Sequence, residues 1–443
     1  MPKYLLQLSQ CHLEFRIPEL ESLAELYNID IDFKAVKYDA NYPYLIIDLP
    51  NSESAKLLVQ RSILTNGIYE LFSEGPTYKE IFKNINKDFD ELLLDEDFNK
   101  KSMKFQLHTS NKRSKYTMPE MVEIFNEFAV LNIKNKINLK SPEVIFQIFE
   151  HYKEVTDETP CTIYFTKLVQ LSLRSKGILD KLRLNKRPYI GTTTFEPELS
   201  LVTCNLSLVK PFKFVYDPFC GTGGFLTAAA TIEKNTLVLG SDMDGRMLRG
   251  NSSKSSTSEH LNNRKNKTPN EVGLEEHIQN LKISKNVQGI ALNFEYYKQS
   301  HQLVSLLTMD FTHNALRSDL SIDSIMCDPP YGIREGIKVL GSDNQDIINN
   351  SKHSMKDGKL AYLHEDYIAS KKQYSLDELI IDILKFAQAR LPKNGRLAFW
   401  VPTKDKRGLD TLVLDEYDDM KLLYNCSQDF NQWSRRVLVY KKV

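Results

Sequence analysis

The segment PFKFVYDPFCGTGGF, residues 211–225, decides the fold class, because it reads as a strand, a glycine-rich turn and the start of a helix. The strand is expected to end at Asp217, and Phe225–Lys234 continues as the helix. Gly221 and Gly223 allow the backbone to turn sharply and to approach a ligand closely. The turn lacks the last glycine of the dinucleotide fingerprint GxGxxG, which disfavours a pyrophosphate cofactor.

Downstream of this turn, strand and helix patterns alternate, which is typical of a parallel doubly wound sheet. Further strands are expected to end at Asp242, Asp310 and Asp328, and the helix Ser375–Leu391 opens with a capping box of Ser375 and Glu378. Three more strands are expected at 396–402, 421–427 and 435–442, and a polar loop at 251–271. Ligands of such sheets bind beyond the carboxyl ends of the strands, so the strand-terminal aspartates predict a polar rim around one ligand. Each aspartate by itself is equally well explained as a cap of the next turn.

The sharpest motif is DPPY, which runs from Asp328 through Pro329 and Pro330 to Tyr331. The two prolines hold the chain extended and lack N–H groups, so the carbonyls here are free to accept hydrogen bonds. The Asp328 carboxylate adds an acceptor, and the Tyr331 ring offers a face on which a base can stack. The motif therefore predicts a site for the exocyclic amine of a planar base. A rigid turn without a function is the alternative.

The acids at the next two strand ends suit a nucleoside. Asp242 is placed to accept hydrogen bonds from ribose hydroxyls, as acids do at the second strand of dinucleotide sites. Asp310 is placed to accept from an adenine amino group. Together with the glycine turn, these positions predict an adenosine ligand that carries no phosphate.

The first part of the chain predicts two small α+β modules. Its first ~75 residues follow the ferredoxin-like order β-α-β-β-α-β, with strands at Tyr4–Leu8, Phe33–Tyr38, Tyr44–Leu49 and Ile68–Phe72 and helices at Pro18–Tyr27 and Ser52–Ser62. The second module has aromatic and β-branched strands at Pro142–Tyr152 and Cys161–Gln170. We predict domains at residues 1–75, 76–172 and 191–443, joined by a basic linker at 173–190.

Composition limits the class of protein. The 443 residues suggest two or three domains, and 58 basic residues balance 58 acidic ones, which argues against a protein that coats nucleic acid indiscriminately. Six scattered cysteines without a CxxC pair predict reduced thiols and no metal site. The sequence shows neither a secretory signal nor an apolar run of the ~18 residues that span a bilayer, so we expect a cytoplasmic protein without a membrane segment.

The motifs resemble those of amino-directed, S-adenosylmethionine-dependent class I methyltransferases from about Thr192 onward. A THUMP domain is resembled by the segments SPEVIFQIFE (141–150) and IYFTKLV (163–169). The range of similar methyltransferases is narrowed further by the segment RPYIGTTTFEPELSLVTCN (187–205). The whole chain is similar to the family of eukaryotic tRNA (guanine(10)-N2)-methyltransferase catalytic subunits. The resemblance implies a Rossmann-like α/β methyltransferase domain with a mixed doubly wound sheet, preceded by ferredoxin-like and THUMP-like modules.

The same resemblance implies an activity and a site. The reaction would transfer a methyl group from S-adenosylmethionine to the N2 amine of a tRNA guanosine at position 10. The amine would be held by Asp328, Pro329, Pro330 and Tyr331. The cofactor would be bound by Thr193, Thr194, Asp217, Gly221, Gly223, Asp242, Met243, Asp310 and Phe311. The implied partner is a small zinc-binding activator subunit that completes a heterodimer.

RNA binding requires local basic surfaces despite the neutral total. The candidate residues are Lys112, Arg113, Lys115, Arg183 and Arg187, and a third basic segment lies at 435–442. For any one segment, a solvated charged face is the more frequent explanation.

Two other functions stay open on the sequence alone. Amino methyltransferases that act on DNA or on protein glutamine share the glycine turn and a DPPY or NPPY motif, although Asp328 and the N-terminal modules favour a base in RNA. A catalytically silent tRNA-binding scaffold is the alternative outside the enzymes, and the complete DPPY motif argues against it.

Overall fold

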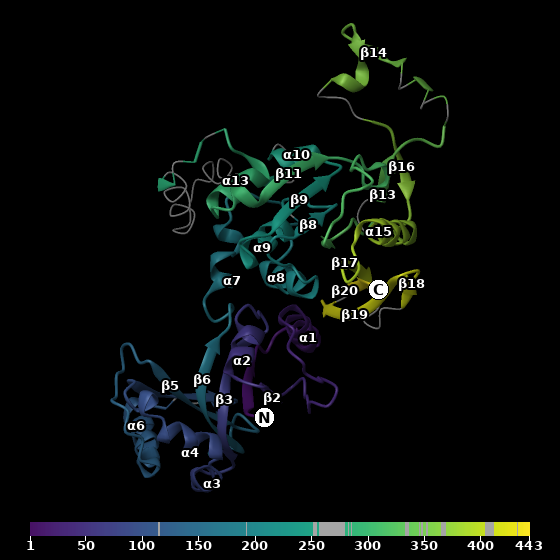
Figure 1. Ribbon diagram of the computed structural model, residues 1–443. Coiled ribbons are helices and arrows are strands. Elements are labelled where there is room, and N and C mark those ends of the chain that lie inside the picture. The colour runs from purple at the N-terminus through teal and green to yellow at the C-terminus, as the bar shows by residue number, and fades with distance from the viewer. Residues whose placement is uncertain are drawn as a thin grey trace. The chain divides into compact units, whose positions relative to one another are not determined.

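The computed structural model describes residues 1–113, 116–191, 193–250, 255–256, 280–281, 283–284, 286–332, 336–344, 346, 349–350, 353–364, 369–403, 412–431 and 433–443. The chain forms two compact units, Met1–Ile178 and Leu179–Val443. Figure 1 shows their helices and strands in colours that run along the chain. Lys115 and the predicted loop at 251–271 lie outside the described residues, except for 255–256.

The first unit contains a six-stranded mixed sheet in the order β2-β1-β3-β6-β5-β4. Its strands are β1 (Lys3–Leu8), β2 (Tyr44–Asp48), β3 (Thr65–Gly75), β4 (Met103–Ser110), β5 (Val144–His151) and β6 (Thr162–Leu171), and its helices are α1 (Arg16–Tyr27), α2 (Ser52–Val59), α3 (Tyr78–Lys83), α4 (Lys87–Leu94), α5 (Glu96–Asn99) and α6 (Met118–Glu127). Because β3 pairs with both β1 and β6, one sheet extends across residue 75. The division predicted at that residue stays a prediction.

Helices cover this sheet because alternate strand residues are apolar. Leu6 and Leu8 of β1 pack with Leu20 of α1 and Leu58 of α2 in one buried cluster. A second cluster, rich in phenylalanine, joins β3, β5 and β6 to α3, α4 and α5. These clusters fix the register of the first unit, because a slip by one residue would turn the apolar side chains outward.

One predicted element of the first unit is wrong. The strand expected at Phe33–Tyr38 is a series of turns. Asp32 accepts a hydrogen bond from the backbone N–H of Lys34 at 3.0 Å, and Asp39 accepts one from Asn41 at 2.8 Å. Such local side-chain bonds give the backbone an alternative to strand pairing, although the sequence between them alternates in polarity.

The second unit contains an eight-stranded mixed sheet in the order β11-β9-β8-β12-β17-β20-β19-β18. Its strands are β8 (Phe214–Asp217), β9 (Leu237–Asp242), β11 (Leu303–Thr308), β12 (Ser324–Cys327), β17 (Arg396–Thr403), β18 (Glu416–Tyr417), β19 (Met420–Asp429) and β20 (Ser434–Lys442). The first five in this series run parallel, and β20 and β19 are antiparallel to their neighbours. The predicted mixed doubly wound sheet is confirmed.

The remaining elements of the second unit are helices and short strands. The helices are α7 (Ile178–Lys181), α8 (Pro197–Leu206), α9 (Gly224–Ile232), α10 (Gly245–Arg249), α13 (Gly289–Tyr296) and α15 (Leu376–Arg390), and the short strands are β7 (Ile190–Gly191), β10 (Ser255–Ser256), β13 (Ile337–Leu340), β14 (Met355–Lys356), β15 (Lys359–Leu360) and β16 (Lys371–Tyr374). Within the described part of the chain, every helix falls short of the length or the apolar character that a bilayer span requires.

Helices pack on both faces of this sheet. Leu379 and Ile383 of α15 share a buried cluster with Leu397 and Phe399 of β17. Trp400, the next residue of β17, points to the opposite face, where its indole N–H donates to Thr203 of α8 at 3.2 Å. The predicted capping box of α15 is confirmed, with Ser375 and Glu378 bonding reciprocally. Two covered faces leave the strand ends as the open part of the sheet.

Candidate active site

The centre of the site is the point where the strand order reverses. From β8 the chain adds β9 and then β11 on one side, and it returns to place β12 on the other side of β8. The carboxyl ends of β8 and β12 therefore lie next to each other, and they carry Asp217 and Asp328. In open α/β sheets this reversal is where ligands bind.

The glycine turn connects β8 to the N-terminus of α9. Gly221 has φ 52° and Gly223 has φ 77°, which are left-handed conformations that favour glycine. A Cβ on Gly223 would lie 2.8 Å from the side chain of Ile290, whereas a Cβ on Gly221 would have nothing within 4 Å. The turn is thus packed behind Gly223 and open beside Gly221.

The segment before α8 is tied to this turn. The hydroxyls of Thr194 and Thr222 share a hydrogen bond of 2.8 Å, and the Thr194 hydroxyl accepts one from the Gly191 N–H at 2.7 Å. Thr194 therefore lies beside the glycine turn, and Thr193 directly precedes it in the sequence. Their predicted contact with the cofactor stays a prediction.

Asp242 and Asp217 bring negative charge to the turn. The carboxylate of Asp242 accepts hydrogen bonds from the N–H groups of Gly221 and Asp244, each at 2.9 Å. Asp217 is 1% exposed and accepts from the Phe219 N–H at 3.1 Å. Burial raises the pKa of both carboxyls, and the charges of Asp242 and Asp328 raise that of Asp217 further. The structure therefore brings Asp217, Asp242 and Asp328 close together.

The DPPY motif follows β12 directly. Pro329 is buried and Pro330 is exposed, while Asp328 and Tyr331 are partly buried. The Tyr331 hydroxyl donates a hydrogen bond to Oδ1 of Asp328. Burial raises the pKa of Asp328 to about 6, although this bond and the charge of Arg435 act in the opposite direction. Among the described residues no donor faces Oδ2, so that oxygen is an acceptor for a ligand.

Sequence reasoning missed a cluster around Arg435, which it placed only in a basic segment. The Arg435 Nε donates to Gln428 at 2.6 Å, and its Nη2 donates to Glu196 at 3.1 Å. Gln428 also donates to Glu196 at 2.6 Å, which closes a ring of three side chains. Glu196 and Gln428 are 232 positions apart in the sequence, so no local pattern could have revealed their contact.

Asp310 and Phe311 are placed differently from the expectation. The strand β11 ends at Thr308, two residues before Asp310, so Asp310 caps a short turn. Its carboxylate accepts hydrogen bonds from Thr312 at 3.0 Å and from the Leu340 N–H at 2.6 Å. Phe311 is buried against Phe219, with ring centroids 5.1 Å apart. The roles predicted for both in cofactor binding, and for the partly buried Met243, stay predictions.

The predicted RNA-binding residues differ in exposure. Arg113 and Arg183 are exposed, whereas Lys112 is partly buried, lies 3.7 Å from the centroid of the Tyr116 ring and donates to Tyr152. Arg187 is 2% exposed, and burial lowers its pKa. This burial leaves little of the Arg187 side chain at the surface, and its predicted role in RNA binding stays a prediction.

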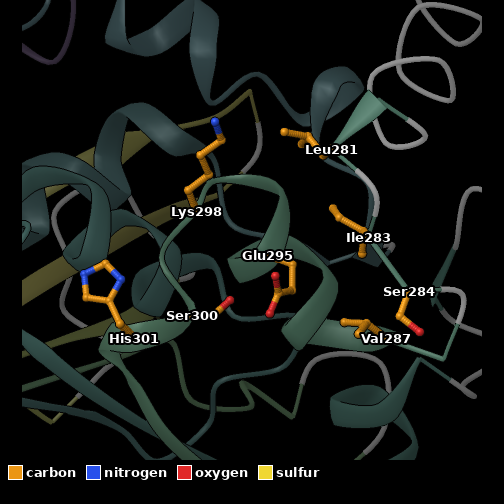
Figure 2. A pocket seen from close by; sticks show the side chains of 8 residues that line it. All are labelled: Leu281, Ile283, Ser284, Val287, Glu295, Lys298, Ser300 and His301. Atoms are coloured by element: carbon orange, nitrogen blue, oxygen red, sulfur yellow. The ribbon is translucent and has the colours of Figure 1, made fainter.

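A hollow beside α13 is separate from the strand ends. Figure 2 shows the eight side chains that line it: Leu281, Ile283, Ser284, Val287, Glu295, Lys298, Ser300 and His301. None of the strand-end aspartates lines it, and its wall mixes apolar side chains with single charges. We assign the chemistry to the strand ends, because the buried acids and the acceptor-rich DPPY turn lie there.

Known proteins similar to this chain agree with this architecture. The Tmrp11 THUMP N-terminal domain matches residues 2–174, and the RMKL-like methyltransferase domain matches residues 185–398. The tRNA (guanine(10)-N(2))-methyltransferase of Saccharomyces cerevisiae is 43% identical over 99% of this chain and 93% of its own length. The chain belongs to the tRNA (guanine(10)-N(2))-methyltransferase family. The family predicted from the motifs is thereby confirmed.

More distant relatives cover the chain to a similar extent. The human tRNA (guanine(10)-N(2))-methyltransferase TRMT11 is 27% identical over 100% of this chain and 88% of its own length. The crystal structure of TrmN from Thermus thermophilus is 16% identical, covers 100% of both chains and has a TM-score of 0.41. As a member of this methyltransferase family, the chain is an enzyme with S-adenosylmethionine as its methyl donor.

The residues at the strand ends fit this cofactor. The space beside Gly221 is open, with no described atom within 4 Å of where a Cβ would lie, and it borders the carboxylate of Asp242. Asp242 accepts one hydrogen bond from a described residue at each carboxylate oxygen, which leaves a second lone pair on each for a hydroxyl. The site therefore has both the opening and the acceptors that an adenosine moiety requires.

Proposed function

We propose that this enzyme methylates the exocyclic N2 amine of guanosine 10 in tRNA. The single observation that carries the proposal is the acceptor geometry of Asp328, whose Oδ1 is held by Tyr331 while Oδ2 faces no described donor. This acceptor lies at the reversal of strand order, beside Asp217 and the glycine turn. The nucleobase, the RNA and the position are those that the name of the Saccharomyces cerevisiae relative gives.

The residues of the chain would act by positioning and by proton acceptance. S-adenosylmethionine supplies, when bound, a methyl group on a positively charged sulfur. Gly221 and Asp242 would hold the cofactor through its adenosine. Asp328 would hold the substrate amine by accepting a hydrogen bond from its N–H. A carboxyl with a pKa of about 6 is mostly ionised at pH 7 and is basic enough to take the proton that the methylated nitrogen loses. Two reactants fixed next to each other need little further catalysis.

The tRNA has to present an unstacked base. A guanine inside a helix cannot reach a pocket at the strand ends, so extrusion of the base is expected. We propose that the first unit binds the tRNA and that the exposed Arg113 and Arg183 contact phosphates. The match of the first unit to a THUMP N-terminal domain supports this assignment.

We also propose that the enzyme is the catalytic subunit of a cytoplasmic heterodimer. The proposed second subunit is a small zinc-binding activator. The six cysteines of this chain are scattered in the sequence without a CxxC pair, which is compatible with a zinc site on the partner.

The decisive experiment is mass spectrometry of nucleosides from substrate incubated with S-adenosylmethionine. The enzyme would be assayed with and without the activator subunit, on tRNA, on DNA and on a glutamine-containing peptide. We expect N2-methylguanosine in tRNA, and a tRNA with guanosine 10 replaced by adenosine should remain unmethylated. Methylation of DNA or peptide instead would reassign the substrate, and cofactor binding without any product would favour the silent scaffold.

A further inference from the structure

We propose that Arg435 is a positioning residue for the methyl transfer, which fixes the Tyr331 hydroxyl and the Asp328 carboxylate for the substrate amine. The inference rests on the proposed function and adds a residue to its mechanism. It starts from the ring of Glu196, Gln428 and Arg435, which lies outside the glycine turn and the DPPY motif and has no other role in the reaction described above.

Arg435 is held from several directions. Its side chain is 13% exposed, and two of its guanidinium nitrogens are bonded to Gln428 and Glu196. The centre of the guanidinium lies 4.0 Å from the ring centroid of Phe195 and 4.9 Å from that of Trp400. A planar cation bonded at its edge and stacked against aromatic rings has little freedom to move.

The clamped cation acts on the DPPY motif. Its guanidinium centre lies 5.6 Å from the ring centroid of Phe430, which stacks on Trp433. The Trp433 ring in turn meets the Tyr331 ring edge-on, with centroids 6.5 Å apart. The positive charge of Arg435 also counteracts the rise in the pKa of Asp328 and of Tyr331. Tyr331 in turn donates to Asp328, so the cation acts on a hydrogen-bonded pair. Through these aromatic contacts Arg435 fixes where the Tyr331 side chain lies, and Tyr331 sets which Asp328 oxygen remains for the amine.

The same clamp is connected to the cofactor side. Glu196 is the N-cap residue of α8 and lies two residues after Thr194, whose hydroxyl is bonded to Thr222 in the glycine turn. Arg435 therefore links the segment beside the proposed cofactor site to the groups that hold the amine. A rigid link of this kind keeps two reacting groups in line, where small displacements lower the rate strongly.

Replacement of Arg435 tests this role through the pH dependence of the rate. The titratable and charged groups described around Asp328 are Tyr331, Arg435, Asp217 and the Cys327 thiol. Asp328 must be ionised to accept the amine hydrogen, so the wild-type rate should fall as the pH drops through about 6. Loss of the positive charge in R435Q should move this acid limb to higher pH.

The assay uses the full chain with its activator and whichever of tRNA, DNA or peptide the wild type methylates. For R435Q we expect kcat to fall by about 10- to 100-fold, with the Kd for S-adenosylmethionine within about threefold of wild type. R435K keeps the charge but not the planar fork, so its acid limb should stay in place while kcat falls about three- to tenfold. If R435Q does not fold, the kcat of R435K tests the inference by itself.

Arg436 supplies the matched control. It is the next residue of β20, points to the other face of the sheet and donates to Asn425 at 3.1 Å. Because Arg436 belongs to the basic segment 435–442, the comparison is made at saturating tRNA, where R436Q should leave kcat and the acid limb unchanged. A wild-type kcat in both Arg435 variants would overturn the inference, and so would an R436Q effect as large as that of R435Q. In either case, methylation of tRNA by the wild type would still support the proposed function. No methylation of any of the three substrates would reject both.

Discussion

Two acids, one in each unit, differ in how their oxygens are used. Glu19 of α1 is 0% exposed, and its carboxylate accepts hydrogen bonds from the Ser62 hydroxyl at 2.8 Å and from the Ile63 and Leu64 N–H groups at 2.9 Å. Asp328 is only partly buried, yet burial raises its pKa to about 6 and one of its oxygens faces no described donor. A buried carboxylate that accepts from three groups of its own unit holds the fold, whereas one that keeps acceptor capacity on an oxygen can hold a ligand.

The largest expected effect tests the reactive side of this comparison. D328N replaces an oxygen acceptor by a donor, so the rate of methyl transfer should fall by about 10²- to 10⁴-fold while the Kd for S-adenosylmethionine stays close to wild type. Methyl transfer from labelled cofactor and calorimetry measure the two quantities. The control is D323N, at the opposite end of β12, where the carboxylate accepts from the Phe214 N–H at 2.9 Å. A D328N enzyme with more than a tenth of wild-type activity would break the comparison.

A smaller loss of activity is expected for Asp242, which accepts one hydrogen bond on each carboxylate oxygen. D242A removes the proposed acceptors for the ribose, so the KM for S-adenosylmethionine should rise by about 10- to 100-fold with a smaller change in kcat. Steady-state kinetics at varied cofactor concentration gives both parameters. D244N is the control, because that carboxylate is occupied by Arg246 at 2.9 Å. Equal KM values for the two variants would show that Asp242 is structural in the manner of Glu19.

Glu19 should respond in stability rather than in chemistry. E19Q places an amide NH2 against N–H donors, so the free energy of unfolding should fall by about 1–3 kcal/mol. Urea denaturation measures this change, and kcat of the folded enzyme should remain within about twofold of wild type. E53Q on α2 serves as the control, because its partner Lys56 forms an exposed pair worth at most about 1 kcal/mol. A large kcat loss in E19Q at full stability would contradict the structural role.

The smallest effect concerns exposed charge. R113E should weaken tRNA binding severalfold and lower the slope of log affinity against log salt by about 1, because one phosphate contact is lost. Fluorescence anisotropy with labelled tRNA at several salt concentrations gives both values. R317E reverses an equally exposed arginine that pairs with Asp319 at 2.7 Å in the second unit. An identical loss in both variants would mean that Arg113 contributes only to net charge.

Much of the architecture could be predicted because its signals are local. The glycine turn, the DPPY motif and the capping box of α15 are each fixed by neighbours within a few residues, and the strands around them follow from apolar periodicity. Phe33–Tyr38 shows where such periodicity fails, since two aspartates nearby bond the backbone into turns. Asp310 shows a smaller failure, because the sequence cannot tell whether a strand ends at an acid or two residues before it.

The site could be predicted only in part for the same reason. Asp217, Asp242 and Asp328 were identified because each directly ends or follows a strand of one sheet. The contacts among Glu196, Gln428 and Arg435 form only when the sheet has formed. No spacing in the sequence could therefore have predicted them. Arg187 shows another limit of the sequence, since a basic stretch does not reveal which of its members is buried.

The position of β20 bears on the order in which the second unit acquires activity. This strand lies between β17 and β19, although both precede it in the sequence. During synthesis β17 therefore has an open edge until β20 arrives, and unpaired edges of this kind invite aggregation. Because β20 also carries Arg435, a nascent chain could complete its cofactor turn well before its amine-holding groups are aligned. Because the same strand pairs with β17 and supplies Arg435, the amine-holding groups would be aligned only in molecules in which this sheet edge is already paired.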